Sequence, residues 1–320
     1  MAIAGLGSAW GIGMETVYGT AVATTVTLPF QGESISTVNN PINPPTLWPG
    51  QVITPDSQFR VGAAQHSGTI ESLAYTKGQE ELWRAAFGGY SFLTDTHTFT
   101  PAVFAESQTH AFGYGGTTSV PSKQYDGGVC TGWTLNASAG EAITFSTDWV
   151  YQGLTLADSD TIAGSTPASM AILTWADVAT LTIGGQGFDC VSEVTITADN
   201  GYATDRLCLG SAEIADPRVY GAGGRTITGE LMIDFEDFST ATPEVVEDFI
   251  NGAAAQAFSM TIVKSSATYT FSGQVRVLGS VPNISDLDIV RFPVPVVFTA
   301  DTGDDTAALT MTLNNGTTTL

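Results

Sequence analysis

Alternation of apolar and polar residues with a period of two is the feature that most limits what this chain can fold into. Val194, Ile196 and Ala198 alternate with threonines, and residues 133–137 and 143–149 repeat the pattern. Successive side chains of a strand point to opposite faces, so each segment has one face for a core and one face for solvent. A single solvated face is typical of antiparallel sheets. The sequence therefore predicts a mainly β protein.

Composition supports this fold class and limits the function. Hydrophobic residues make up 43% of the 320 residues, which is enough for a core, whereas charged residues make up only 13%. The polar surface must therefore consist largely of Thr, Ser, Asn, Gln and Gly, and Thr suits a pleated surface. The formal net charge is −22, and an acidic surface repels a phosphate backbone. Adhesive nucleic-acid binding is not expected, and the acidity also keeps a sheet-rich protein soluble.

Two short segments have helical periodicity instead. Lys77–Phe87 and Thr242–Ile250 each carry two apolar pairs spaced four residues apart, which form one apolar stripe. Thr242 is a suitable N-cap, and Pro243 suits the first helical position. Both segments stop at glycine, as helices commonly do. We expect two helices, each covering the edge or outer side of a sheet through its stripe.

The surroundings of the two helices resemble each other. A strand that opens with Gly precedes each helix (Gly68–Glu71 and Gly229–Met232), and a short strand and a long hairpin follow it. This shared order predicts an internal duplication with a period of about half the chain. The halves are residues 1–156 and 172–320, joined by a linker at about 157–171 that is rich in Ser, Thr, Ala and Gly. We expect two tandem β-sandwich or curled-barrel folds, each flanked by one short α-helix.

The histidines and cysteines show no pattern that indicates metal or catalytic chemistry. The three histidines have neither HxH nor HExxH spacing, and the three cysteines form no CxxC pair. We expect the histidines to be structural and the cysteines to be buried thiols in a reducing compartment. These residues are His66, His97, His110, Cys130, Cys190 and Cys208.

Two acidic runs are the remaining candidates for chemistry. Asp301–Asp305 could bind a cation but lacks the EF-hand spacing and its closing Glu. Asp234, Glu236 and Asp237 could suggest the carboxylate pair of a glycosidase. Asp234 and Glu236 share strand parity, however, and so mark a solvated face. The sequence predicts no catalytic, cofactor-binding or metal-ligating residue and no cofactor, and we expect the chain not to be an enzyme.

Several short motifs follow one another along the chain: Glu15–Ala21, Leu28–Phe30, Gly68–Gly89, His97–Pro101, Leu181–Gly185 and Asp199–Arg206. In their order and spacing, these motifs resemble the tail tube (major tail) proteins of siphophages, particularly those of actinobacterial phages. The resemblance covers most of the chain. The resemblance to this family implies no catalytic residue in the chain.

The resemblance implies a structural subunit of a virion tail, made in the cytoplasm of the host bacterium. Subunits of this family place strands side by side in rings, the rings stack head to tail, and DNA passes through the lumen without specific binding. Tape measure, tail terminator and tip proteins are implied partners. Most such subunits carry one fold and form hexamers. A duplicated chain therefore favours trimeric rings with pseudo-sixfold symmetry, with a hexamer as the alternative.

Loops and termini are expected to connect subunits in such an assembly. The Pro-rich loop Asn39–Pro55 and its counterpart Asp199–Gly224 are candidates for ring-to-ring contacts, because long loops in compact proteins are commonly functional. Ala2–Gly13 and Thr302–Leu320 are candidate arms that become ordered on assembly. No stretch approaches the ~20 apolar residues of a membrane span, and the N-terminal segment lacks a basic region before an apolar one. We expect neither a signal peptide nor a membrane partner.

Two other functions remain open from the sequence. A capsid decoration protein, or another virion β-protein, would explain the acidity and the strands but not the repeated strand–helix pattern. A carbohydrate-binding β-sandwich would need exposed aromatic rings beside carboxylates. Trp133 and Trp149 occupy the apolar parity of their strands, so we expect them in the core instead.

Overall fold

Antiparallel strands form most of the part of the chain that the structure describes. The structure is a computed structural model, and it describes residues 8–40, 42, 62–114, 122–157, 162, 166–167, 169–188, 190–209, 213–217, 224–234, 254–278, 291–300 and 308–316. Within these ranges the helices are α1 (Glu80–Phe87) and the 3₁₀ turn η2 (Trp175–Asp177). The prediction of a mainly β fold is confirmed.

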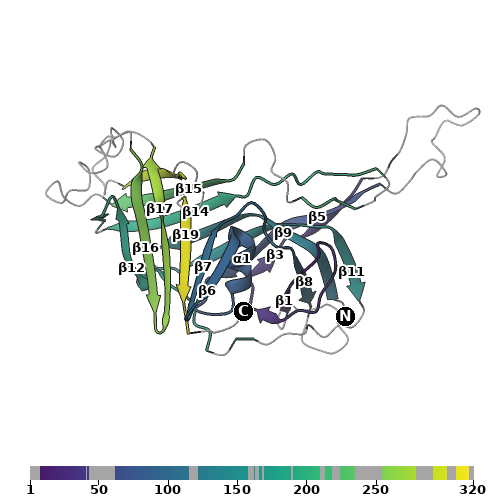
Figure 1. The fold of residues 1–320 in the computed structure, drawn as a ribbon. Coiled ribbons are helices and arrows are strands. Elements are labelled where there is room, and N and C mark those ends of the chain that lie inside the picture. Colours follow the sequence, from purple (N-terminus) through teal and green to yellow (C-terminus); the bar gives the residue numbers. More distant parts are fainter. Residues whose placement is uncertain are drawn as a thin grey trace, which may run out of the picture.

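The strands are numbered along the chain (Figure 1). They are β1 (Ala9–Met14), β2 (Val26–Leu28), β3 (Gly32–Glu33), β4 (Ser36–Asn39), β5 (Ala64–Leu73), β6 (Gly88–Leu93), β7 (Thr96–Pro101), β8 (Gln108–Gly113), β9 (Ser122–Ser138), β10 (Thr144–Tyr151), β11 (Gly153–Ala157), β12 (Val178–Ile183), β13 (Gln186–Gly187), β14 (Val191–Asp199), β15 (Thr226–Asp234), β16 (Gln256–Lys264), β17 (Ala267–Val277), β18 (Arg291–Phe298) and β19 (Leu309–Asn314).

One continuous run of neighbouring strands, which we call the long sheet, is β4–β5–β10–β9–β14–β15–β18–β17. Every neighbouring pair in it is antiparallel. Its register gathers residues of one parity on one face. Thr147 lies opposite Ile70 on one side and opposite Trp133 on the other, and all three are buried. One face of the long sheet therefore belongs to the core, as the alternation predicts.

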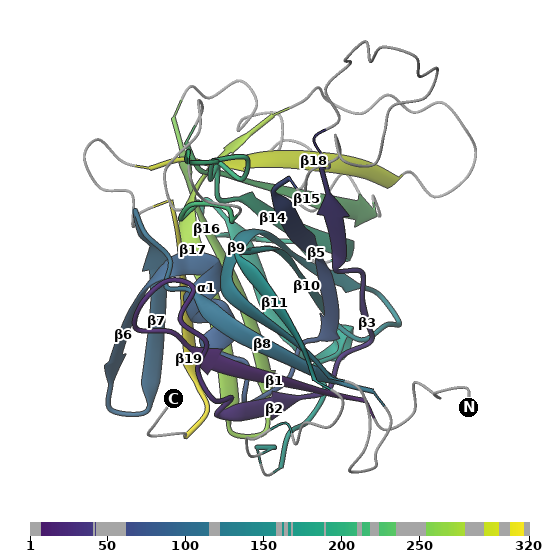
Figure 2. The ribbon, with the colours of Figure 1, turned by 90° about the vertical axis from the view of Figure 1, so that its right-hand side faces the viewer.

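Shorter strands form a second layer, which lies below the long sheet in Figure 1 and is turned toward the viewer in Figure 2. β9 serves both layers, because residues 122–128 pair with β8 and residues 129–136 pair with β10. β1 pairs with β2 and β8, and β11 pairs with the first part of β9. Towards the other end of the molecule, β12, β16, β17, β19, β7 and β6 are successive antiparallel neighbours.

Helix α1 fills the space between the two layers. Its first turn carries Glu80 and Glu81 and its last turn carries Arg84, the charge order that suits the helix dipole. Trp83 is 1% exposed and stacks on Phe145 of β10, with ring centroids 3.9 Å apart. The helix thus packs on the buried face of the long sheet instead of covering an edge or an outer side.

The two predicted halves share one sheet and one core. β14 pairs with β9 along residues 132–138, and β19 pairs with β7. In the core, Trp83 and Phe271 meet edge to face, with ring centroids 5.8 Å apart. The predicted boundary at 156 falls near the end of β11 and the boundary at 172 falls between β11 and β12, and the division into two halves stays a prediction.

Several element boundaries differ from the prediction for local reasons. α1 begins at Glu80 instead of Lys77, and Gly78 just before it has a φ of 92°, which does not continue into a helix. The segment 26–39 is divided into three short strands, β2, β3 and β4, and β2 ends just before Pro29, which has no N–H to donate to a ladder.

The described parts of the two predicted arms are core strands, so the arm prediction is wrong for them. Trp10 and Ile12 of β1 are fully buried, and so are Leu309, Met311 and Leu313 of β19. The alternation of these apolar residues favours a strand with one buried face. The predicted helix Thr242–Ile250 and most of the Pro-rich loop Asn39–Pro55 lie outside the described residues.

We predict that Trp83→Ala lowers the free energy of unfolding by about 3–5 kcal/mol, because it removes a large ring from between the two layers. Urea unfolding followed by far-UV circular dichroism measures the loss. Leu93→Ala is the control, because Leu93 is 78% exposed and its truncation should change stability by no more than about 0.5 kcal/mol. Equal losses in the two variants would contradict the central place of Trp83.

Candidate assembly surface

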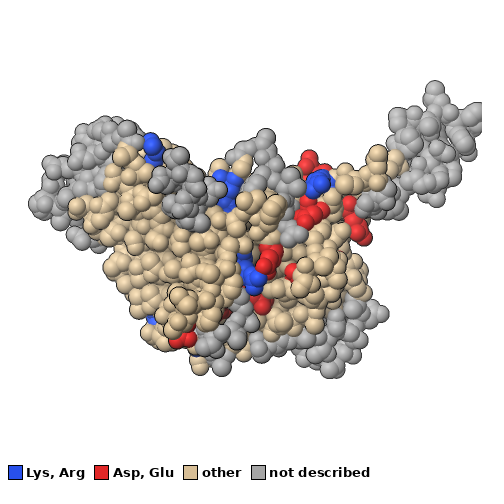
Figure 3. Space-filling view, viewed as in Figure 1, with Lys and Arg blue, Asp and Glu red and all other residues tan. Residues whose placement is uncertain are grey.

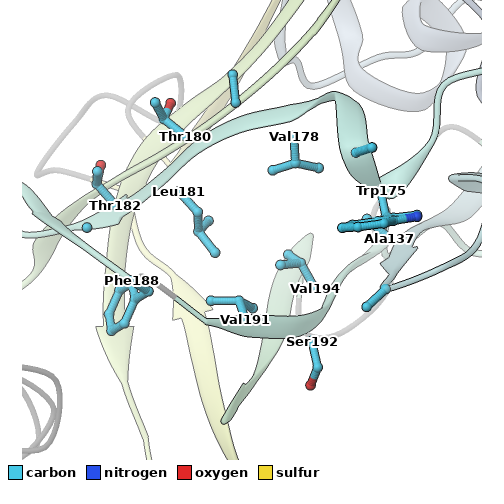
Figure 4. A pocket seen from close by; sticks show the side chains of 14 residues that line it. Ala137, Trp175, Val178, Thr180, Leu181, Thr182, Phe188, Val191, Ser192 and Val194 are labelled. Carbon is cyan, nitrogen blue, oxygen red and sulfur yellow. The ribbon is translucent and has the colours of Figure 1, made fainter. Parts of the chain in front are cut away.

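An open apolar cleft of about 490 Å³ lies between β12, β14 and the end of β9 (Figure 4). Its walls include Trp175, Leu181 and Val194, and none of the residues that line it has a titratable side chain. The Ser192 hydroxyl at its edge donates a hydrogen bond to the Met232 carbonyl oxygen at 3.2 Å. This cleft therefore offers neither a general acid or base nor an activated nucleophile.

The three histidines lie in separate strand environments, each with its own hydrogen-bond partner. The nearest contacts are between His66 Nδ1 and Thr37 Oγ1 at 2.8 Å, and between His97 Nδ1 and Tyr90 Oη at 3.0 Å. His110 is fully buried, and its Nδ1 lies 2.8 Å from the Tyr151 hydroxyl. In the described ranges, no group of three or more His, Cys, Asp or Glu residues is placed to hold a metal ion.

The cysteine prediction is confirmed for one residue and wrong for another. Cys130 is fully buried, and burial raises the pKa of its thiol well above the usual range. Cys190 is half-buried, whereas Cys208 is exposed. A buried thiol behaves as a small apolar side chain, so Cys130 contributes to packing.

The two acidic runs fall mostly outside the described residues. Asp234 is the last residue of β15. The other acidic residues of the two runs, Glu236, Asp237 and Asp301–Asp305, lie outside the described residues. Their predicted solvent exposure therefore stays a prediction. The aromatic platform that a carbohydrate-binding protein would need is not formed by Trp133 or Trp149, because each is only 1% exposed.

The face of the long sheet opposite α1 carries mostly hydroxyl, amide and carboxylate groups, with a few apolar side chains such as Leu73, Met232 and Val297, and we call it the polar face. Cross-strand hydrogen bonds connect these groups. Asn136 Nδ2 donates to Glu193 Oε1 at 2.6 Å and to Thr195 Oγ1 at 2.9 Å. By register, the polar face contains Ser34, Ser36, Val38, Thr69, Glu71, Gly132, Thr134, Asn136, Ser146, Asp148, Glu193, Thr195, Thr197, Asp199, Thr228, Glu230, Arg276 and Leu278.

The charge of the polar face is predominantly negative. Its carboxylates are Glu71, Asp148, Glu193, Asp199 and Glu230, whereas Arg276 is the basic residue that the register places there among the described side chains. Thr69 Oγ1 donates a hydrogen bond to Asp148 Oδ1 at 2.5 Å. The register therefore makes the polar face a hydroxyl-rich surface with scattered negative charge, which does not attract phosphates. On the side of the molecule that Figure 3 shows, which is that of Figure 1, charged side chains are also sparse among the described residues.

The long sheet ends in two strands with an open edge. β4 has β5 as its strand partner within the described ranges, and all four residues of β4 are exposed. At the other end, the last residues of β17 pair with β18 on one side, whereas β16 reaches only as far as Val275 on the other. Open edges carry unpaired N–H and C=O groups, which can pair with another chain.

The sequence did not identify which carboxylates lie on the polar face or which strands have an open edge. Strand parity alone places Asp148 on the side opposite Trp149, so this part of the signal is present in the sequence. Which strands become neighbours, and which edge stays open, depends on pairings such as β9 with β14 that join residues far apart in the chain.

Comparison with known proteins identifies a family. The chain matches the model of a family described as phage tail tube protein over residues 5–319. The search of curated proteins finds no match. Among the described residues, no helix has both the length and the apolar character needed to cross a bilayer. The family match spans both parts of the long sheet and both of its open edges.

We predict that the buried His110 makes the fold less stable in acid. Burial lowers the pKa of His110 from 6.5 to about 3, so the folded chain keeps this ring neutral while the unfolded chain binds a proton. The contribution of His110 to the free energy of unfolding is therefore fully present above about pH 6.5, and it is lost as the pH falls towards about 3. Urea unfolding at several pH values between 7 and 4 measures the slope.

His110→Gln should flatten this pH dependence. Tyr151→Phe is the matched control, because it removes the hydroxyl that contacts His110 but keeps the titrating ring. It should lower stability at every pH and leave the slope steep. An equal slope in the wild type and in His110→Gln would contradict the assignment.

Proposed function

The chain belongs to the phage tail tube protein family, and we propose that three copies of it form each ring of the tube. It is a structural subunit of the tail tube in the virion. In the proposed ring, each chain occupies two of six similar positions. The tape measure protein inside the tube, and the terminator and tip proteins at its ends, are further partners that belong to the proposal.

The observation that carries the trimer is that strand neighbours recur in the two parts of the chain. β4–β5–β10–β9 and β14–β15–β18–β17 are two runs of antiparallel neighbours with the same order along the chain. β1–β8–β9 and β12–β16–β17 correspond in the same way. A chance likeness of two β-rich segments would not reproduce all of these pairings, so they support the duplication.

A residue-level likeness supports the same reading. Gly229 of β15 lies opposite Ile196 of β14, and Gly68 of β5 packs against Ile35, just before β4. A Cβ on Gly68 would lie 2.5 Å from the Cα of Ile35. Both isoleucines are buried. The same pair of a glycine and a buried isoleucine thus occurs at corresponding places.

The duplicated chain favours a trimer over a hexamer because one chain already supplies two of the repeated units. The units are not identical, however. The β6–β7 hairpin lies within residues 74–107, which connect β5 to β8, whereas the corresponding connection between β15 and β16 is the shorter segment 235–255. A ring of three chains would therefore show approximate sixfold order with a threefold difference.

The polar face is the surface that would line the lumen. The opposite face of the long sheet is covered by α1 and the second layer, so only the polar face is free to face DNA. Its carboxylates would repel phosphates, and its hydroxyl groups carry no positive charge to hold them. DNA could then slide through without adhering.

End-on cryo-electron microscopy of assembled rings tests the trimer. We expect class averages with strong sixfold order and a weaker threefold component, and a ring mass of three chains by native mass spectrometry. Sixfold order without the threefold component, together with the mass of six chains, would support the hexamer instead. Monomers that form neither rings nor tubes would contradict the proposed function.

Neutralising carboxylates of the polar face should slow DNA ejection. We predict that phage carrying Glu71→Gln with Glu230→Gln release DNA more slowly than wild type at low salt, because the lumen repels phosphates less. At high salt the difference should shrink, since charges are screened over about 8 Å already at 0.15 M. A DNA-release assay over a range of salt concentrations measures the rate.

The matched control removes two charges elsewhere. Asp95 lies in the turn between β6 and β7, and Glu106 pairs with Arg84 of α1. Asp95→Asn with Glu106→Gln removes the same number of negative charges as the polar-face double variant and should leave the ejection rate unchanged. Equal rates for the two double variants at low salt would contradict a lumen lined by the polar face.

A further inference from the structure

We propose that the β9–β14 junction inside one chain is repeated between neighbouring copies, so that β4 of one copy pairs with the end of β17 of the next and Val38 faces Leu278. This inference rests on the proposed function, because it identifies the contact that closes the ring. The partner is a second copy of this chain, and the register comes from comparing the two parts of the long sheet.

The β9–β14 junction serves as the template. The Asn200 N–H donates to the Thr131 carbonyl oxygen at 2.8 Å, and Asp199 lies opposite Gly132. Since hydrogen-bonded and non-hydrogen-bonded pairs alternate in antiparallel sheets, Asp199 and Gly132 form a non-hydrogen-bonded pair whose side-chain positions are close together. Two residues further along each strand is the next non-hydrogen-bonded pair, Thr134 and Thr197, and the hydroxyl groups of these two residues lie 3.2 Å apart.

The first edge, β4, corresponds to β14. Ile35 packs against Gly68 as Ile196 pairs with Gly229. Counting along the strands from these isoleucines places Val38 at the position of Asp199. The same count places Asn39 at the position of Asn200.

The second edge, the end of β17, corresponds to the middle of β9. In the first part of the long sheet, Thr69 lies opposite Asp148, which lies opposite Gly132. In the second part, Glu230 lies opposite Pro295. The Leu278 N–H donates to the Pro295 carbonyl oxygen at 2.8 Å, which places Leu278 at the position of Gly132.

The backbone groups at both edges point in the required directions. In β4, the Asn40 N–H donates to the Ala63 carbonyl oxygen on the β5 side at 3.3 Å, so the alternation turns the N–H and C=O of Asn39 away from β5. In β17, Leu278 bonds to β18, so Val277 faces away from β18. Asn39 of one copy and Val277 of the next can therefore exchange two backbone hydrogen bonds.

The side chains at this register are complementary in a way that an isolated chain does not explain. Val38 is 49% exposed and Leu278 is 48% exposed, and both lie on the mainly polar face. The template places their Cβ atoms next to each other, so assembly would remove both apolar side chains from water. At the corresponding positions inside the chain lie Asp199 and Gly132. Neither of these residues has an apolar side chain that pairing would remove from water.

The geometry also favours a closed ring. Each copy has one β4 edge and one β17 end, which are different surfaces, so the contact is head to tail. A head-to-tail contact closes into a ring when its rotation allows. The β9–β14 junction already joins two corresponding units in one chain, and repeating it between chains continues the long sheet in the same direction.

Cysteine cross-linking tests this register. In a chain with Cys190→Ser and Cys208→Ser, Val38→Cys with Leu278→Cys should form a disulfide between copies when assembled rings are oxidised mildly, because cysteines at non-hydrogen-bonded pairs lie within reach of each other. Non-reducing gels should show most of the monomer converted into a ladder that ends at the covalent trimer. A ladder that ends at the hexamer would keep the register but overturn the trimer.

Matched variants make the test specific. Thr134→Cys with Thr197→Cys, at the template junction, should cross-link within one chain and add no band above the monomer. Ser36→Cys with Leu278→Cys, two residues out of register, should cross-link at least tenfold less. Tubes that form normally but give no Val38–Leu278 product would overturn the register and leave the proposed function standing, whereas the absence of any ring or tube would overturn the proposed function itself.

Asn39→Pro gives an independent readout. Proline removes only the N–H that points away from β5, so the isolated chain should keep its circular dichroism spectrum and unfolding midpoint. Ring formation measured by light scattering should fall at least tenfold. Normal assembly of this variant would contradict pairing through Asn39.

Discussion

Backbone pairing along β9 is the interaction on which the rest of this structure depends. β8 and β11 pair with its first part, and β10 and β14 pair with its second part. The strand can pass from one layer to the other because Gly127 has a φ of 64°, and a Cβ on Gly128 would lie 2.7 Å from the Tyr151 ring. Without this bend the second layer would not fold back over α1, and the core would have no second wall.

The separation of the two faces of the long sheet follows from that arrangement. The second layer and α1 cover most of one face, apart from the apolar cleft beside β12, so most residues of the apolar parity lie in the core and the polar parity faces outward. Trp133 and Asn136 show this division within one strand, since the first is buried under α1 and the second hydrogen-bonds along the polar face. A protein built this way presents a hydroxyl-rich, weakly charged surface, which suits sliding contacts better than tight binding.

The sequence predicts the parts of this fold that depend on local periodicity. Alternation located β9, β10 and β14, and the apolar stripe located α1. The sequence did not predict that β1 and β19 are core strands, because distant partners fix the position of short strands near the ends of the chain. β19, for example, pairs with β17 and with β7. Strand parity alone predicts that Asp148 lies on the polar face. The extent of that face could not be predicted, because the β9–β14 pairing joins residues that local patterns do not connect.

The duplication explains why exposed strand edges need not cause uncontrolled aggregation. An unpaired edge is a hazard because any similar edge can pair with it. In this chain the β9–β14 junction covers one such edge permanently, and tethering the two parts makes that pairing intramolecular and therefore strongly favoured. In the long sheet, the open edges that remain among the described residues are β4, only four residues long, and the end of β17. An edge as short as β4 gives a weak contact on its own, so pairing becomes stable only when both ends of every copy are engaged, which is the condition that a closed ring satisfies.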